Sequence, residues 1–134
     1  MKKEDKLKIL AICSKGQNRS KYLAQYLRKK GYSTRFGGAE GDDDPKKFWK
    51  PITQKQIDWA DVIIVVRPRL KNVIKKKFKV GKTKFIILNV TDSKRLIPSE
   101  YSHLKELDYV AFQKKWTRPQ LRKALKPYLP IKKK

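Results

Sequence analysis

The chain has 134 residues, of which 39% are hydrophobic, so it is long and apolar enough to fold as one domain with a core. Its 36 Lys and Arg residues against 12 Asp and Glu give a net charge of +24, which favours anionic partners such as nucleic acid or phosphorylated protein. A single cysteine excludes an internal disulfide. One cysteine and one histidine in the whole sequence are too few for a Cys/His zinc site. No apolar run approaches the roughly 18 residues of a membrane span, and the charged N-terminus does not resemble a signal peptide, so the expected compartment is the cytoplasm.

The first half of the chain predicts two strands around a helix, in a single domain over residues 1–134 with flexible basic ends at 1–7 and 130–134. The unbroken apolar run at residues 8–12 is typical of a strand that is covered on both faces of a parallel sheet. A helical pattern begins near Ser20 and has basic residues in its last turn, with Gly31 as its stop. Residues 32–36 predict a short second strand, broken by the glycines at 37–38, and a long connection follows over residues 38–52.

The second half continues the alternation of strands and helices. Thr53 is a candidate N-cap for a short helix over residues 54–60, and residues 62–66 form the clearest buried strand. A helix with an apolar face then leads to Gly81, and residues 85–88 form the fourth strand. Two further helical patterns follow, and Pro119 suits the first turn of the last helix. The apolar positions of the three helical patterns are Leu70, Val73, Ile74 and Phe78, then Leu104, Leu107 and Ala111, then Leu121, Leu125 and Tyr128.

Strands that alternate with helices predict a doubly wound α/β domain, with four parallel strands in the order 2-1-3-4 and helices on both faces. In such sheets a ligand binds outside the carboxyl ends of the strands, at the point where the strand order reverses. Cys13 follows the first predicted strand directly and therefore lies where that rule places a ligand.

The stretch between the first strand and the first helix is the motif with chemical content. It reads Cys13-Ser14-Lys15-Gly16-Gln17-Asn18-Arg19-Ser20. A loop that opens a helix directs backbone N–H groups at one point, and the helix N-terminus adds partial positive charge there. An anion is the expected occupant, held by residues 14–18 and Ser20, and the same field favours a thiolate at Cys13.

A cysteine, five residues, an arginine and a serine on a strand-loop-helix unit resemble the low-molecular-weight protein tyrosine phosphatase family, most closely its small archaeal and bacterial branch. Residues 58–61 resemble that branch's entry to the third strand, and residues 85–92 resemble the strand and loop that carry its general acid. The resemblance covers about residues 8–110. This chain has Lys15 and Gly16 where the family usually has Gly and Asn, and it lacks the Asp-Pro pair usual after the fourth strand.

The resemblance implies a cysteine-dependent hydrolase of phosphotyrosine or another aryl phosphate, without metal or cofactor. Cys13 would form a phosphocysteine intermediate, and Arg19 would bind two phosphate oxygens with its planar fork. Ser20 would donate a hydrogen bond to the sulfur. Asp92 would be the general acid, because it follows the fourth strand, and Trp49 would belong to the aromatic rim around the substrate.

Each of these residues has a simpler interpretation. Cys13 could be a small buried residue at a strand end, Ser20 an N-cap, and Asp92 a turn residue. The aspartates at 42–44 compete with Asp92 as the acid, and they also admit a magnesium interpretation. His103 is expected to be structural or exposed.

Two other functions remain open at this point. A cysteine phosphocarrier would use the same strand end, although it would not need Arg19. A phosphatase fold could also serve as a basic binder of nucleic acid or phosphoprotein, with binding that falls steeply as salt rises.

Overall fold

The computed structural model describes residues 6–14, 18–40, 51–91 and 93–132. Its centre is a four-stranded sheet in the order β2-β1-β3-β4, and every neighbouring pair of strands is parallel. The predicted α/β fold and its strand order are therefore confirmed. The strands are β1 (Lys8–Cys13), β2 (Ser33–Gly38), β3 (Val62–Val65) and β4 (Lys84–Ile87).

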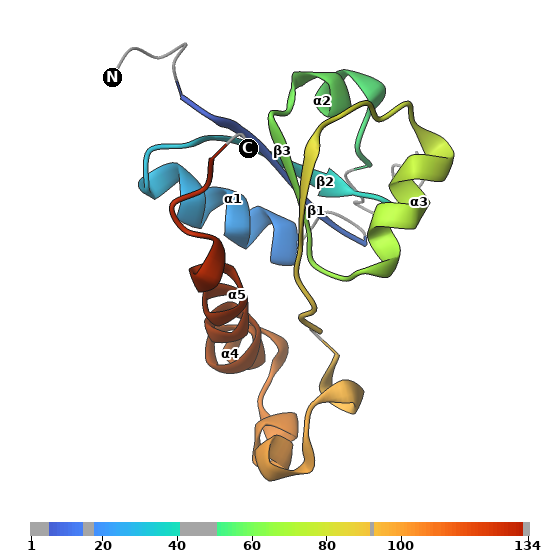
Figure 1. Ribbon diagram of the computed structural model, residues 1–134. Helices are drawn as coiled ribbons and strands as arrows, with labels where there is room; N and C mark the ends of the chain where they lie inside the picture. The colour runs from blue at the N-terminus through green and yellow to red at the C-terminus, as the bar shows by residue number, and fades with distance from the viewer. Residues whose placement is uncertain (1–5, 15–17, 41–50, 92, 133–134) are drawn as a thin grey trace.

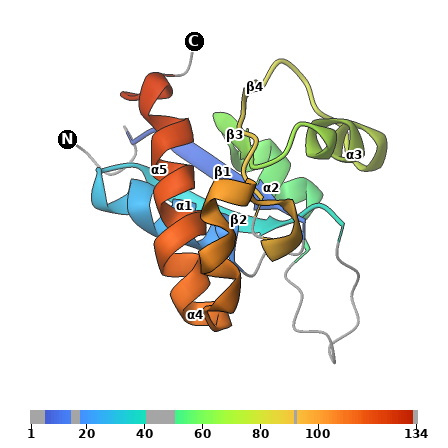
Figure 2. The ribbon, with the colours of Figure 1, turned by 90° about the horizontal axis from the view of Figure 1, so that it is seen from below.

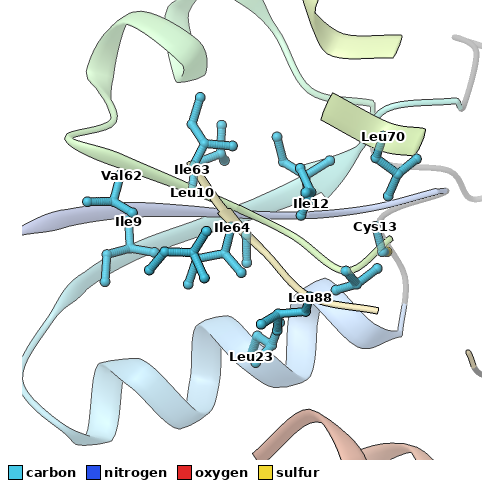
Figure 3. Close-up of a cluster of buried hydrophobic side chains, with 14 of the residues drawn as sticks. Ile9, Leu10, Ile12, Cys13, Leu23, Val62, Ile63, Ile64, Leu70 and Leu88 are labelled. Carbon is cyan, nitrogen blue, oxygen red and sulfur yellow. The ribbon is translucent and has the colours of Figure 1, made fainter. Parts of the chain in front are cut away.

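Helices cover both faces of this sheet (Figure 1). Helices α1 (Arg19–Lys29) and α5 (Arg118–Leu125) lie on one face, and α2 (Gln54–Trp59) and α3 (Arg69–Lys77) lie on the other. Figure 3 shows Leu23 of α1 and Leu70 of α3 approaching the strands from opposite sides, and both side chains have no exposed surface. Strand β1 is central and five of its six residues are buried, as its unbroken apolar run predicts.

The sequence predicts the end of α1 correctly but places the end of β2 too early. Gly31 has φ of 101°, a backbone conformation that glycine adopts without strain, so the predicted helix stop is confirmed. The predicted break at residues 37–38 is wrong, because β2 continues to Gly38. Gly37 and Gly38 pair with Ile12 and Cys13 of β1, so β2 runs beside β1 as far as the candidate nucleophile.

Helix α2 begins as the sequence predicts. The Thr53 hydroxyl accepts the backbone N–H of Gln56 at 3.2 Å, and the Gln56 side chain accepts the N–H of Thr53 at 3.1 Å. This reciprocal pair satisfies two N–H groups that a helix start would otherwise leave without partners. Helix α3 buries Leu70 and Ile74, directs its lysines outward, and ends at Lys77, four residues before Gly81.

The region after β4 is more irregular than predicted. It comprises η3 (Lys94–Leu96), η4 (Ser99–Glu106), α4 (Tyr109–Phe112), the π-helical turn η5 (Gln113–Thr117), α5 and η6 (Lys126–Tyr128). Pro119 lies in the first turn of α5, but the helical run begins ten residues earlier, at Tyr109. Proline cannot donate an N–H within a helix, and the π turn ends at Thr117, two residues before Pro119. Ile97, Leu104, Phe112 and Trp116 form a small second hydrophobic cluster in this region.

Residues near both ends of the described chain pack against the core. Leu7 packs against the core, and its carbonyl accepts the N–H of Ser33 at 3.0 Å. Ile131 is only 5% exposed, and its N–H donates to the Tyr32 hydroxyl at 2.8 Å. Both residues cover apolar core surface, which holds them in place. Among the described residues, no helix combines the length and the apolar character needed to cross a membrane.

Candidate active site

The cysteine and the serine of the motif meet at the carboxyl end of β1. Cys13 is the last residue of β1 and is 3% exposed, and Ser20 lies in the first turn of α1 with no exposed surface. The Cys13 Sγ and Ser20 Oγ atoms are 3.1 Å apart. Asn18, not Ser20, is the N-cap residue of α1, and it makes no side-chain capping bond. The Ser20 hydroxyl therefore faces the thiol and does not cap the helix.

Arg19 is the first residue of α1, yet it is only 7% exposed, and it is the one Lys or Arg among the buried residues that the structure describes. Its Nη1 donates to the backbone carbonyl of Val90 at 2.8 Å. Val90 lies in the segment after β4, two positions before Asp92 in the sequence. One guanidinium thus connects the start of α1 to the segment that precedes the candidate general acid.

Backbone hydrogen bonds join the segments that leave the four strands. The N–H groups of Ala39 and Glu40, after β2, donate to the carbonyls of Cys13 and Ser14 at 2.9 and 2.8 Å. The N–H of Val66, after β3, donates to the Ile12 carbonyl at 3.1 Å. The N–H of Val90, after β4, donates to the Val66 carbonyl at 2.9 Å. The site therefore lies at the edge of the sheet where the strand order reverses, as expected for this architecture.

Sequence reasoning missed two residues of the π turn that contact the site. Gln113 is 4% exposed, and its Oε1 accepts the Asn18 Nδ2–H at 2.7 Å. Trp116 donates its Nε1–H to the backbone carbonyl of Thr91 at 3.2 Å. The turn thus contacts both the residue before Arg19 and the residue before Asp92. Pro119 is the only nearby sequence signal for an irregular helix here, and it does not indicate what the turn would contact.

Two cavities border these contacts. One, of about 360 Å³, is lined by Val90, Thr91 and Trp116, by Arg67 after β3 and by Leu96 of η3, among others. The other, of about 290 Å³, has Asn18 and Gln113 among its lining residues. In the described ranges, no group of three His, Cys, Asp or Glu side chains is arranged to hold a metal ion.

The described residues hold part of the predicted site. Cys13, Ser14, Asn18, Arg19 and Ser20 are brought together at the junction of β1 and α1. The other predicted site residues lie outside the described ranges, and so do the competing aspartates at 42–44. The predicted site residues that the structure does not describe are Lys15, Gly16, Gln17, Trp49 and Asp92.

Comparison with known proteins finds similarity in structure rather than in sequence. No family model matches the chain, and no curated protein matches it. A low-molecular-weight phosphotyrosine phosphatase from Vibrio cholerae O395 superimposes with a TM-score of 0.57 at 15% identity, covering 88% of this chain and 91% of that one. A low-molecular-weight protein tyrosine phosphatase from Bacillus subtilis gives 0.55 at 16% identity, covering 90% and 98%.

A third similar structure is the arginine phosphatase YwlE, in a cysteine-to-serine variant whose active-site serine is phosphorylated. It gives a TM-score of 0.57 at 18% identity, covering 94% of this chain and 98% of that one. These matches cover at least 88% of this chain and at least 91% of each similar structure. The chain therefore has the fold of the low-molecular-weight protein tyrosine phosphatases.

Proposed function

We propose that this protein is a cysteine-dependent phosphatase that hydrolyses phosphotyrosine in protein substrates. The observation that supports this most strongly is the 3.1 Å approach of Cys13 Sγ to Ser20 Oγ at the start of α1, beside the buried Arg19. An arginine at a helix N-terminus provides positive charge and planar donors where a phosphate would bind. A nucleophile, a donor to that nucleophile and a phosphate clamp would then share one loop.

In the first step, the Cys13 thiolate attacks phosphorus and forms an S–P bond while the bond to the leaving-group oxygen breaks. Arg19 stabilises charge on the phosphoryl oxygens with its guanidinium, whose orientation is fixed through the Val90 carbonyl. The backbone N–H groups of residues 14–19 would complete the cradle.

In the second step, water attacks phosphorus, the S–P bond breaks and inorganic phosphate leaves. The departing sulfur regains negative charge. The Ser20 hydroxyl, within hydrogen-bond distance of Sγ, stabilises that charge by donating to it. Ser20 thus acts mainly on breakdown of the phosphocysteine.

A general acid protonates the leaving oxygen in the first step and activates water in the second. We assign this role to Asp92 because hydrogen bonds tie the two preceding residues to the site. The Thr91 carbonyl accepts from Trp116, and the Val90 carbonyl accepts from Arg19. Trp49 would contact the aromatic ring of the substrate. The net charge of +24 would favour encounter with phosphorylated, anionic proteins.

The similar structures act on more than one kind of phosphorylated residue, since two are described as tyrosine phosphatases and one as an arginine phosphatase. The test therefore compares phosphotyrosine and phosphoarginine forms of one peptide, along with a small aryl phosphate. We expect the highest kcat/KM with phosphotyrosine. We also expect inhibition by vanadate, which mimics the transition state of phosphoryl transfer.

The matched control is Cys13→Ser, which changes one atom of the nucleophile. We expect it to lose activity while keeping the fold, as judged by circular dichroism and melting temperature. Equal hydrolysis by Cys13→Ser would contradict the proposal. A phosphocysteine that forms but does not turn over would favour the phosphocarrier, and salt-sensitive binding of nucleic acid without hydrolysis would favour the basic binding protein.

A further inference from the structure

The cavity of about 290 Å³ is lined by Asn18, which also belongs to the proposed phosphate cradle. One wall is the exposed side of α1, and the other is the run from α4 through the π turn to α5, which lies alongside α1 (Figure 2). Its lining residues on α1 are Lys21, Tyr22 and Gln25, and those opposite are Tyr109, Val110, Gln113 and Arg118.

The charge of this cavity is positive. Among the described residues that line it, Lys21 and Arg118 are the ionised ones and none is acidic. Asp108 is the nearest acid in the sequence, but its carboxylate accepts the N–H of Ala111 at 2.8 Å as the N-cap of α4. A cavity with cations and no acid in its walls attracts an anion.

The Arg118 side chain lies against an aromatic ring at this cavity. Its guanidinium lies 5.3 Å from the centre of the Tyr22 ring, and its Nε is buried without a hydrogen-bond acceptor among the described residues. Because the Nε atom is itself buried, an anion in the cavity would bind the terminal nitrogens of the guanidinium.

The position of the cavity relates it to the substrate. Asn18, Lys21, Tyr22 and Gln25 are spaced i, i+3, i+4 and i+7, so they form one stripe on α1 that starts at the phosphate loop. At 1.5 Å per residue this stripe is about 10 Å long. An extended peptide covers that distance in about three residues, at roughly 3.3–3.6 Å each.

We propose that this cavity is a substrate subsite that binds a second anionic group, a carboxylate or a phosphate, within about three residues of the phosphorylated side chain of a protein substrate. Lys21 and Arg118 supply the charge, and Tyr22 positions the Arg118 guanidinium by packing against it. The inference rests on the proposed phosphatase function and names its preferred substrates as acidic or multiply phosphorylated sequences.

The test measures kcat/KM for a set of peptides with one phosphotyrosine. The flanking three residues on either side are Glu, Gln or phosphoserine in matched sequences. We expect wild type to prefer the Glu peptide over the Gln peptide on one side by on the order of fivefold, the scale of one partly exposed ion pair. A phosphoserine peptide that exceeds the Glu peptide would identify phosphate as the preferred group.

The variant is Lys21→Gln with Arg118→Gln, and the matched control is Lys75→Gln with Lys76→Gln, which removes the same charge from exposed positions on α3. The ratio of Glu to Gln peptide should fall to about one in the first and stay at the wild-type value in the second. If Arg118→Gln prevents folding, Lys21→Glu alone should reverse the preference, because Lys21 is exposed. An unchanged ratio in the cavity variant, or an equal fall in the control, overturns the subsite.

Failure of the subsite is distinguishable from failure of the phosphatase. Hydrolysis of a small aryl phosphate reports the phosphatase alone, since that substrate has no second anionic group. If wild type hydrolyses nothing, fluorescence anisotropy with Cys13→Ser measures binding of the same peptides. The preference for Glu over Gln, and its loss in the cavity variant, then support or overturn the subsite without turnover.

Discussion

Replacing Gln113 with leucine tests whether the π turn positions the phosphate loop. The change removes the acceptor that lies 2.7 Å from Asn18 Nδ2 and leaves an apolar side chain in a place that is 4% exposed. Loss of one partner of a part-buried hydrogen bond costs roughly 1–2 kcal/mol. If the loss falls on the transition state, kcat/KM for an aryl phosphate drops about 5- to 30-fold, since about 1.4 kcal/mol is tenfold.

The control for this variant is Thr117→Val in the same turn. Thr117 is 1% exposed and its Oγ1 has no hydrogen-bond partner among the described residues, so an isosteric apolar side chain should leave kcat/KM unchanged and stability equal or higher. The inhibition constant of vanadate separates positioning from folding, because it should rise in Gln113→Leu and stay constant in the control. A folded Gln113→Leu protein with kcat/KM within about twofold of wild type would refute the positioning role.

Three further changes test other parts of the account. Arg19→Lys keeps the charge but removes the planar fork, so kcat should fall by about 100-fold or more while the protein remains folded by circular dichroism; a loss under tenfold would contradict the clamp. Ser20→Ala should slow release of phosphate from sulfur more than its transfer, so rapid-mixing kinetics should show a larger burst of leaving group than wild type, and the absence of that increase would argue against a role in the second step. Thr53→Ala removes a helix cap far from the site and should cost about 1 kcal/mol, or about 4 °C in melting temperature, with kcat unchanged.

Most of the fold could be predicted because it depends on local patterns. The apolar runs of β1 and β3 are buried on both faces, which the composition of such strands directly reflects. Gly31 and Thr53 end and begin helices for reasons confined to their neighbours. The extent of β2 could not be read locally, because its glycines are held in the strand by pairing with β1.

In the candidate site, too, the residues close in sequence could be predicted and the distant contacts could not. Cys13, Arg19 and Ser20 are close in sequence, and their spacing at a strand-to-helix junction predicts the loop. Gln113 is 95 positions from its partner Asn18, and nothing in its own neighbourhood indicates that contact. The carbonyl that accepts from Arg19 is likewise 71 positions away. Contacts of this kind depend on how the last helices pack against the sheet, which the sequence pattern does not specify.

The most direct test of the central claim is to detect the covalent intermediate. Wild-type protein is mixed with an aryl phosphate, quenched in acid during turnover, and digested for mass spectrometry. The account predicts one phosphoryl group on the peptide that contains Cys13, lost on longer incubation and accumulating further in Ser20→Ala. Hydrolysis without a phosphoryl group on that peptide, or with the group on another residue, would contradict the account.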